Sequence, residues 1–297
     1  MSKAKIATAP CSWGVWWADG TPSGTPWNVF LDQAAEAGYQ ALELGPDGYL
    51  PTDLGRLREE LAKRSLEACA GTACYDFSQY NSVDDFRERL DSLCARIAAL
   101  DAKYLVTMDG DGDYSKKHLR TPAEWKHLLD MFREMGHYTM EKYGVEVVFH
   151  PHAGTHVETE AEIEELMDHC GLRLCFDIGH HAVVNGSWEH GDMSAIDFMR
   201  KHKDKIAYLH YKNVNGEVRR KMLQGEMTRD EAFGSDIMCD LRDGIVDYNM
   251  VRDLMDEMNF TGIGVIEQDV PKATTDEAFA IAKRNLAYLR EIGLIEV

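Results

Sequence analysis

Strand-like and helix-like segments alternate eight times along this chain, and this repetition constrains the fold more than any other feature. Short apolar runs predict strands at 4–9, 39–45, 66–71, 103–108, 145–150, 172–177, 206–210 and 262–267. Apolar residues at helical spacing predict helices at 26–37, 53–64, 82–100, 121–143, 159–169, 192–203, 247–259 and 275–292. Eight such units imply parallel strands with crossover helices. We therefore expect an α/β fold that closes as a single (β/α)₈ TIM barrel.

No proline-rich or serine-rich linker divides the chain, so we expect one domain over residues 1–297. One connection is irregular, because residues 213–246 are too polar and too often interrupted by glycine to form one helix. Long loops in compact domains are commonly lids or binding elements, and a tolerated surface insertion is the alternative. Because the segment directly follows a strand that bears candidate ligands, we favour the lid.

The charge balance argues against polyanionic partners. The formal net charge is −19, with 51 acidic and 32 basic residues, whereas phosphate recognition needs clustered lysine and arginine. We expect a small-molecule substrate rather than nucleic acid or a membrane, and a homo-oligomer is compatible with the composition. The first residues contain no apolar signal-peptide core. The seven cysteines form no CxxC pair, so we expect a cytoplasmic protein with reduced thiols.

Four predicted strands end in side chains that commonly bind divalent metals. The four segments are 147–152 (VVFHPH), 174–181 (LCFDIGHH), 207–212 (AYLHYK) and 264–269 (GVIEQD). Histidine and carboxylate groups are the usual ligands of Mn²⁺, Co²⁺, Fe²⁺ and Zn²⁺. Active sites of (β/α)₈ enzymes lie at the carboxyl ends of the strands. The pattern therefore predicts one divalent metal site at that end of the barrel.

Strand alternation predicts which side chains share the inner face. On each predicted strand, two candidate residues share this face: His150 and His152, Cys175 and Asp177, His210 and Lys212, and Glu267 and Asp269. Each residue taken alone has a plain alternative role, the pairing of buried backbone donors. Two features favour a site: carboxylates seldom end strongly apolar strands without a partner, and the four positions match in consecutive units.

Glu158 and the pair His180 and His181 carry open alternatives. Glu158 precedes a capping box formed by Thr159 and Glu162, so it is either part of a helix start or a loop carboxylate that folds back to the metal. His180 lies three residues after Asp177, where it can act as a base, a substrate clamp or a partner of a ligand. We expect His180 to point inward and His181 to face solvent.

Candidate substrate-binding residues follow strands one, two and four. Trp13, Trp16 and the neighbouring Trp17 can form an aromatic wall for a sugar-like ring, and simple packing is equally compatible. Glu43 and Asp109 can bind hydroxyl groups, with solvated loop acids as the alternative. No GxxxxGK[ST], GxGxxG or GxSxG motif occurs, so nucleotide-driven and serine-esterase chemistry lose support.

These residues resemble the xylose-isomerase-like barrel superfamily of sugar isomerases, epimerases and dehydratases, and most closely its inosose dehydratase branch. The resembling stretches are 9–16 (APCSWGVW), 43–51 (ELGPDGYLP), 149–159 (FHPHAGTHVET), 176–180 (FDIGH) and 241–247 (LRDGIVD). The resemblance implies that Asp177, His210 and Glu267 bind a Mn²⁺-type ion.

The chain departs from the superfamily at the end of strand five, where His150 stands in place of the usual glutamate. Either His150 replaces that ligand, or Glu158 supplies the carboxylate and His150 becomes a base. We favour the second, because Glu158, Asp177, His210 and Glu267 form a set suited to Mn²⁺ or Co²⁺, with Fe²⁺, Mg²⁺ and Zn²⁺ as alternatives.

The resemblance implies a metal-dependent lyase that dehydrates a cyclic polyhydroxy ketone such as inosose (2-keto-myo-inositol). The metal would polarise the ketone, while His150 or His152 removes the α-proton and either His180 or a metal-bound water assists departure of the β-hydroxyl. Lys212 would neutralise the enolate or hold a hydroxyl, with a solvated lysine as the alternative. An isomerase or epimerase, a β-elimination of a 3-keto-glycoside and a non-catalytic sugar-binding protein are the rival hypotheses.

Overall fold

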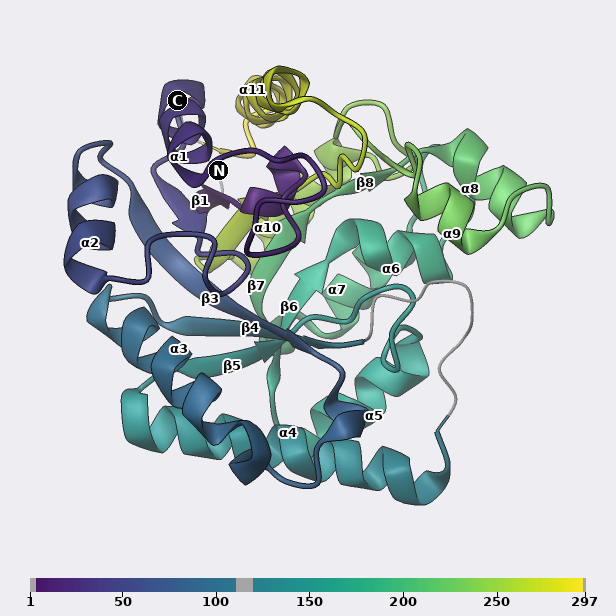
Figure 1. Cartoon of the computed structure of the whole chain (residues 1–297). Helices are drawn as coiled ribbons and strands as arrows, with labels where there is room; N and C mark the ends of the chain where they lie inside the picture. The colour runs from purple at the N-terminus through teal and green to yellow at the C-terminus, as the bar shows by residue number, and fades with distance from the viewer. Residues whose placement is uncertain (1–3, 111–119, 296–297) are drawn as a thin grey trace.

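Eight parallel strands close into a barrel in the computed structural model, which describes residues 4–110 and 120–295 (Figure 1). Neighbouring strands are paired in the order β1-β10-β7-β6-β5-β4-β3-β2, so that each strand lies beside its neighbours in the sequence. The prediction of a (β/α)₈ barrel is confirmed. The barrel strands are β1 (Lys5–Thr8), β2 (Ala41–Glu43), β3 (Glu67–Tyr75), β4 (Tyr104–Asp109), β5 (Glu146–Phe149), β6 (Arg173–Asp177), β7 (Ile206–Tyr211) and β10 (Ile263–Ile266).

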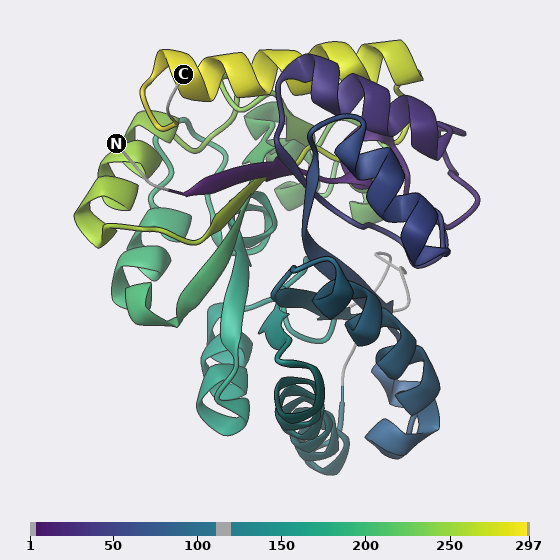
Figure 2. The same cartoon turned by 90° about the vertical axis from the view of Figure 1, so that its left-hand side faces the viewer.

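The eight predicted helices are all present and form the outer ring. They are α1 (Trp27–Ala37), α2 (Leu54–Ala62), α3 (Arg87–Ala99), α4 (Pro122–Tyr143), α5 (Glu160–Cys170), α7 (Ser194–Lys201), α10 (Tyr248–Met258) and α11 (Thr275–Glu291). Figure 2 shows α11 lying along α1, so the last helix closes the ring against the first. Short 3₁₀ turns cover Pro10–Trp13, Phe77–Gln79, Val83–Phe86 and Lys203–Lys205.

Outside the irregular segment 213–246, one helix was not predicted, α6 (Ile178–Asn185), which begins directly after β6. Its first turn is capped by Asp177, whose Oδ1 accepts a hydrogen bond of 2.8 Å from the His180 backbone N–H. The same carboxylate therefore ends the strand and starts the helix. The eight-residue segment has no clear helical periodicity, which is why the sequence pattern did not reveal it.

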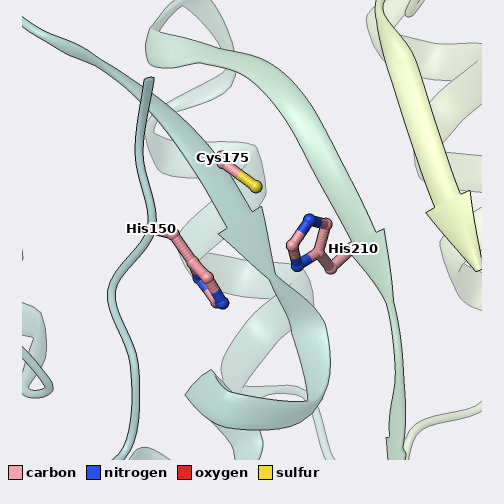
Figure 3. A group of neighbouring side chains, drawn as sticks. All are labelled: His150, Cys175 and His210. Atoms are coloured by element: carbon pink, nitrogen blue, oxygen red, sulfur yellow. The ribbon is translucent and has the colours of Figure 1, made fainter. Parts of the chain in front are cut away.

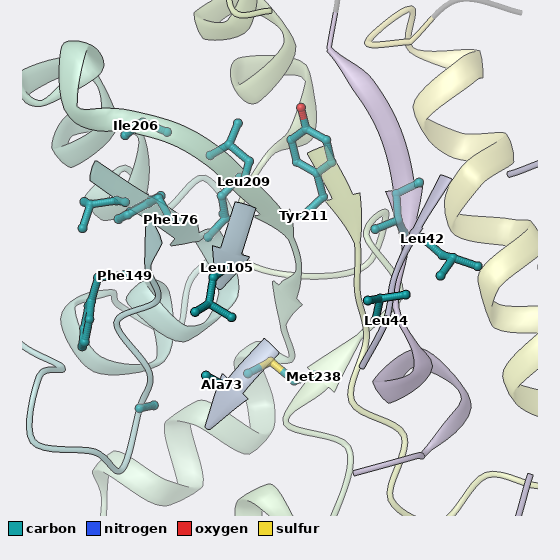
Figure 4. Close-up of a cluster of buried hydrophobic side chains, with 14 of the residues drawn as sticks. Leu42, Leu44, Ala73, Leu105, Phe149, Phe176, Ile206, Leu209, Tyr211 and Met238 are labelled. Carbon is teal, nitrogen blue, oxygen red and sulfur yellow. The ribbon is translucent and has the colours of Figure 1, made fainter. Parts of the chain in front are cut away.

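The strands separate two apolar layers by alternation of their side chains, with register shifts between Leu42 and Glu43 and between Leu174 and Cys175. Outward side chains pack against the helices, and Figure 4 shows Leu42, Leu105, Phe149, Phe176 and Leu209 among them. Inward side chains are mostly small and fill the barrel, and they include Ala7, Ala41, Ala70, Val106, Val148, Cys175, Tyr208 and Val265. Because alternation continues past the apolar part of each strand, the polar residues at the strand ends also point inward.

The irregular segment 213–246 folds into small elements beside the carboxyl end of the barrel (Figure 1). Two short strands, β8 (Asn213–Val214) and β9 (Met238–Cys239), pair antiparallel, and α8 (Gly216–Leu223) and α9 (Arg229–Phe233) lie between them. Buried Asn213 anchors the segment, since its Nδ2 donates to the carbonyls of Leu241 (2.8 Å) and Val246 (2.9 Å). Within 4–110 and 120–295, no helix is long and apolar enough to cross a membrane.

Candidate metal centre at the carboxyl end of the barrel

Three predicted ligands meet where β6, β7 and β10 end. Asp177 and His210 are partners in the β6–β7 register, and Glu267 follows β10 directly. His210 Nδ1 lies 3.4 Å from Asp177 Oδ2 and 3.1 Å from Glu267 Oε2. Each of these two distances is one that a pair of ligand atoms has when both bind the same ion at bonds of about 2.0–2.2 Å.

His150 joins this group from the end of β5. Its backbone N–H donates to Thr107 O at 2.7 Å, which continues the β4–β5 ladder by one residue and points the imidazole inward. His150 Nε2 lies 4.0 Å from Asp177 Oδ2. Among the described residues, Asp177 Oδ2, His210 Nδ1 and His150 Nδ1 are buried without a well-oriented hydrogen-bond partner. Buried polar atoms are seldom left so, and the donor set therefore fits a divalent cation.

The ammonium group of Lys212 lies among the same carboxylates. Its Nζ is 2.9 Å from Glu267 Oε2, 3.3 Å from Asp177 Oδ2 and 3.0 Å from Asp269 Oδ2. It also donates to His180 Nε2 at 3.2 Å. The alternative of a solvated lysine is wrong, because only 2 % of the side chain is exposed.

Gly179 leaves space for the side chain of Lys212. A Cβ at position 179 would lie 2.7 Å from Lys212 Cγ, so any larger residue there would push the lysine out of the site. Glycine is therefore needed at position 179 to make room for Lys212, and not to form a turn.

The local charges set the ionisation of these groups. Burial alone would raise the pKa of Asp177, but the Lys212 ammonium and His210 outweigh it and hold that pKa below its ordinary value. Burial lowers the pKa of His180 well below its usual range. Burial, aided by the charge of Lys212, lowers the pKa of His152 to about 4. His152 and His180 are therefore neutral near pH 7.

The carboxylate of Glu158 has other partners than the four residues described above. Its Oε2 accepts hydrogen bonds from Arg229 Nη2 (2.7 Å) and from the Gly154 backbone N–H (2.8 Å). The carboxylate thus ties the loop after β5 to α9, whereas His150 Nε2 lies beside Asp177 at 4.0 Å.

Glu43 and Asp109 are buried rather than solvated. Glu43 Oε1 accepts a hydrogen bond of 3.0 Å from His210 Nε2, which orients the imidazole so that Nδ1 faces Asp177 and Glu267. Asp109 Oδ1 accepts from the Phe77 backbone N–H at 3.0 Å, while its Oδ2 contacts His156 Nδ1 and Arg120. Both acids are therefore already engaged by protein donors.

Some of the aromatic and histidine candidates belong to the hydrophobic core rather than to the site. Trp13 is fully buried, donates its indole N–H to Gln33 Oε1 (2.7 Å) and packs on Phe30, so packing accounts for it. Trp16 is 38 % exposed and can still contact a ligand. The expectation that His181 faces solvent is wrong, because it is buried beside Phe176 and Phe198.

Two contacts of the site have no counterpart in the sequence pattern. Arg229, in the middle of the irregular segment, reaches Glu158. The thiol of Cys11, three residues beyond β1, donates to Glu267 Oε1 at 2.7 Å. For Cys11 the available signal was its place just past a strand end, and for Arg229 no local pattern exists.

A model of the xylose isomerase-like TIM barrel family matches residues 31–292. The chain belongs to this family. Near-full-length relatives within it are inosose dehydratases. That of Geobacillus thermodenitrificans is 25% identical over 98% of this chain and 97% of its own length, and that of Histophilus somni is 25% identical over 97% of each.

Solved structures share the family fold at lower identity. The IOLI protein with a bound zinc atom superposes with a TM-score of 0.71 at 17% identity, covering 97% of each chain. The 3-keto-D-glucoside 4-epimerase YcjR of E. coli gives 0.65 at 15% identity, covering 97% of this chain and 100% of its own. These likenesses establish the barrel and carry no assignment of activity.

Proposed function

We propose that this protein is a metal-dependent dehydratase, a carbon–oxygen lyase that removes water from inosose or a closely related cyclic polyhydroxy ketone. The observation that carries the proposal is the near-full-length similarity to several inosose dehydratases. The cluster of imidazoles and carboxylates at the carboxyl end of the barrel supports it, because enolate chemistry needs a cation and neutral bases in one cavity.

His150, Asp177, His210 and Glu267 would hold the ion in this proposal, with Glu43 orienting His210. Two imidazoles and two carboxylates suit Mn²⁺, Fe²⁺, Co²⁺ or Zn²⁺. The bound ion would act as a Lewis acid that polarises the ketone and lowers the free energy of the enolate.

His152 is the proposed base for the α-proton. Its Nδ1 lies 2.9 Å from Ala153 O, which makes that nitrogen the hydrogen-bond donor and Nε2 the basic nitrogen. The ring lies 3.6 Å, centroid to centroid, from the ring of His180. His180 Nε2 accepts from the Lys212 ammonium, so Lys212 and His180 together can deliver one proton to the departing β-hydroxide.

Segment 213–246 would cover this site. Arg229 of α9 is held by Glu158, and the ring of Phe233 lies parallel to that of His180 at a centroid distance of 6.0 Å. One contact joins the irregular segment to the loop that carries the proposed base, and the other joins it to helix α6, which carries His180. A closed lid would exclude water from the enolate. Trp16 remains the candidate for stacking on the ring of the substrate.

The first half of this mechanism also serves an isomerase, an epimerase or a β-elimination of a 3-keto-glycoside, because all of them pass through the same enolate. Mass spectrometry of the Mn²⁺-loaded or Co²⁺-loaded protein incubated with inosose separates them. A product lighter by one water supports the dehydratase. A product that retains all the atoms of inosose, except for deuterium taken up when the reaction runs in deuterated water, indicates isomerisation or epimerisation. If neither product forms, the dehydratase and the isomerase or epimerase are both contradicted for inosose.

A further inference from the structure

A sulfur-containing set of ligand atoms lies one strand position deeper than the proposed metal centre. Cys175 precedes Asp177 by two residues on β6, so both side chains point into the barrel. One ligand atom each of His150, Cys175 and His210 lies within 4.8 Å of the other two. Figure 3 shows the thiol of Cys175 pointing toward His210, with the ring of His150 beside them. We propose that these three residues form a second site, which binds thiophilic ions such as Zn²⁺ and Cd²⁺.

The three side chains have the burial that a built site requires. Cys175 is fully buried, and His150 and His210 are 3 % and 2 % exposed. Nδ1 of His150 has no hydrogen-bond partner among the residues that the structure describes. One ligand atom of this imidazole lies within 4.8 Å of the thiol, and a buried imidazole with an unpartnered nitrogen is unfavourable unless a ligand completes its bonding.

The spacing suits a small ion after a slight contraction. Three atoms no more than 4.8 Å apart lie within about 2.8 Å of a common centre, and zinc bonds of about 2.0–2.3 Å to nitrogen and sulfur are then within reach of side-chain rotation. Binding would convert the Cys175 thiol to a thiolate and release one proton to solvent.

The softness of the ligands decides which ion each set prefers. Thiolate sulfur favours Zn²⁺ and Cd²⁺, whereas carboxylate oxygens such as those of Asp177 and Glu267 suit Mn²⁺ and Mg²⁺. Both sets use His150 and His210, so this part of the inference rests on the proposed function. An ion at the sulfur set would withdraw both imidazoles from the oxygen-rich centre. Zn²⁺ and Cd²⁺ would therefore inhibit the Mn²⁺-loaded enzyme.

Titration of the metal-free protein with Cd²⁺ alone tests the site directly. Ligation by thiolate produces a ligand-to-metal charge-transfer band in the ultraviolet, and we expect one such thiolate per chain. Cys175→Ser and Cys175→Ala should both abolish the band, with folding checked by thermal unfolding. Cys11→Ser is the control, since the Cys11 thiol contacts Glu267 Oε1 of the proposed metal centre at 2.7 Å and could itself bind an ion there. Its band should be that of the wild type.

Two outcomes would overturn the site: no band in the wild type, or a band that persists in both Cys175 variants. Asp177→Asn separates this inference from the proposed function, because it should lose Mn²⁺ binding measured by electron paramagnetic resonance and keep the Cd²⁺ band. Loss of the band in Asp177→Asn would contradict a separate sulfur set. A wild-type band without any turnover of inosose would refute the dehydratase alone, and turnover without a band would refute the sulfur site alone.

Discussion

Lys212 Nζ lies 2.9 Å from Glu267 Oε2, with both side chains buried at the end of the barrel. The protein thus places an ammonium group against a carboxylate that we propose as a metal ligand. A divalent ion and this ammonium both neutralise the same buried charge, so their effects on stability are coupled.

Lys212→Met should therefore make the protein depend on metal for its stability. Without the ammonium, Asp177, Glu267 and Asp269 lose a buried partner, and the metal-free variant should be destabilised by roughly 3–5 kcal/mol. Added Mn²⁺ should then raise the melting temperature of the variant more than that of the wild type. Exposed Lys272→Met is the control. An equal Mn²⁺-induced shift in variant and wild type would count against the coupling.

Asp177→Asn and Glu267→Gln should each lose bound metal. Each substitution removes a negative charge and a strong oxygen ligand from a site with only two proposed carboxylates. Metal content per chain, measured by plasma mass spectrometry after dialysis, should fall from about one ion to near zero. Glu165→Gln, on the exposed face of α5, should keep its metal. Full occupancy in both site variants would eliminate the proposed centre.

His150→Asn and Glu158→Gln distinguish the two versions of the ligand set. His150 Nε2 is 4.0 Å from Asp177 Oδ2, whereas the Glu158 carboxylate is bound by Arg229. We expect His150→Asn to lose metal affinity and Glu158→Gln to retain metal. The reverse pattern would restore Glu158 as the ligand and leave His150 as the base.

Arg229→Met should weaken substrate binding without removing the metal. The Glu158–Arg229 ion pair of 2.7 Å joins α9 to the loop after β5, so breaking it frees the proposed lid. KM should rise, and the double variant with Glu158→Gln should be no worse than either single variant, because both lose one interaction. Arg220→Met is a matched control, since both arginine side chains are 26 % exposed. Strictly additive effects on KM would argue against the shared contact.

His181 should make the protein less stable in mild acid. Burial lowers the pKa of His181 from 6.5 to about 4, and although Glu160 Oε1 is 3.2 Å away, that side chain is 46 % exposed. As the pH falls from 6.5 toward 4, His181 becomes protonated in the unfolded chain but stays neutral in the folded chain. The free energy of unfolding then decreases by about 3 kcal/mol at most.

His181→Leu should reduce the decrease in the free energy of unfolding between pH 7 and pH 5, as measured by urea unfolding at the two pH values. Exposed His137→Leu, on α4, should leave the pH dependence unchanged. An identical pH dependence in His181→Leu and the wild type would mean that other groups account for the acid sensitivity.

The sequence by itself determined the barrel and the inward direction of the strand-end residues. Apolar periodicity identified all eight barrel strands and their crossover helices, because each unit must bury one face against its neighbours. The two-residue period of a strand then made Asp177 and His210 point inward, and the parallel order brought them into register. These are local rules, and they hold without knowledge of distant contacts.

The tertiary structure alone decided what those side chains touch. Glu158 pairs with Arg229, 71 residues away, and no spacing rule relates a loop after β5 to a helix in segment 213–246. Lys212 reaches Asp177, Glu267 and Asp269 only because β6, β7 and β10 are adjacent and Gly179 leaves room for its stem. Loop conformation and side-chain partners depend on packing between segments far apart in the chain. Local periodicity does not encode that packing, so the sequence could only leave these alternatives open.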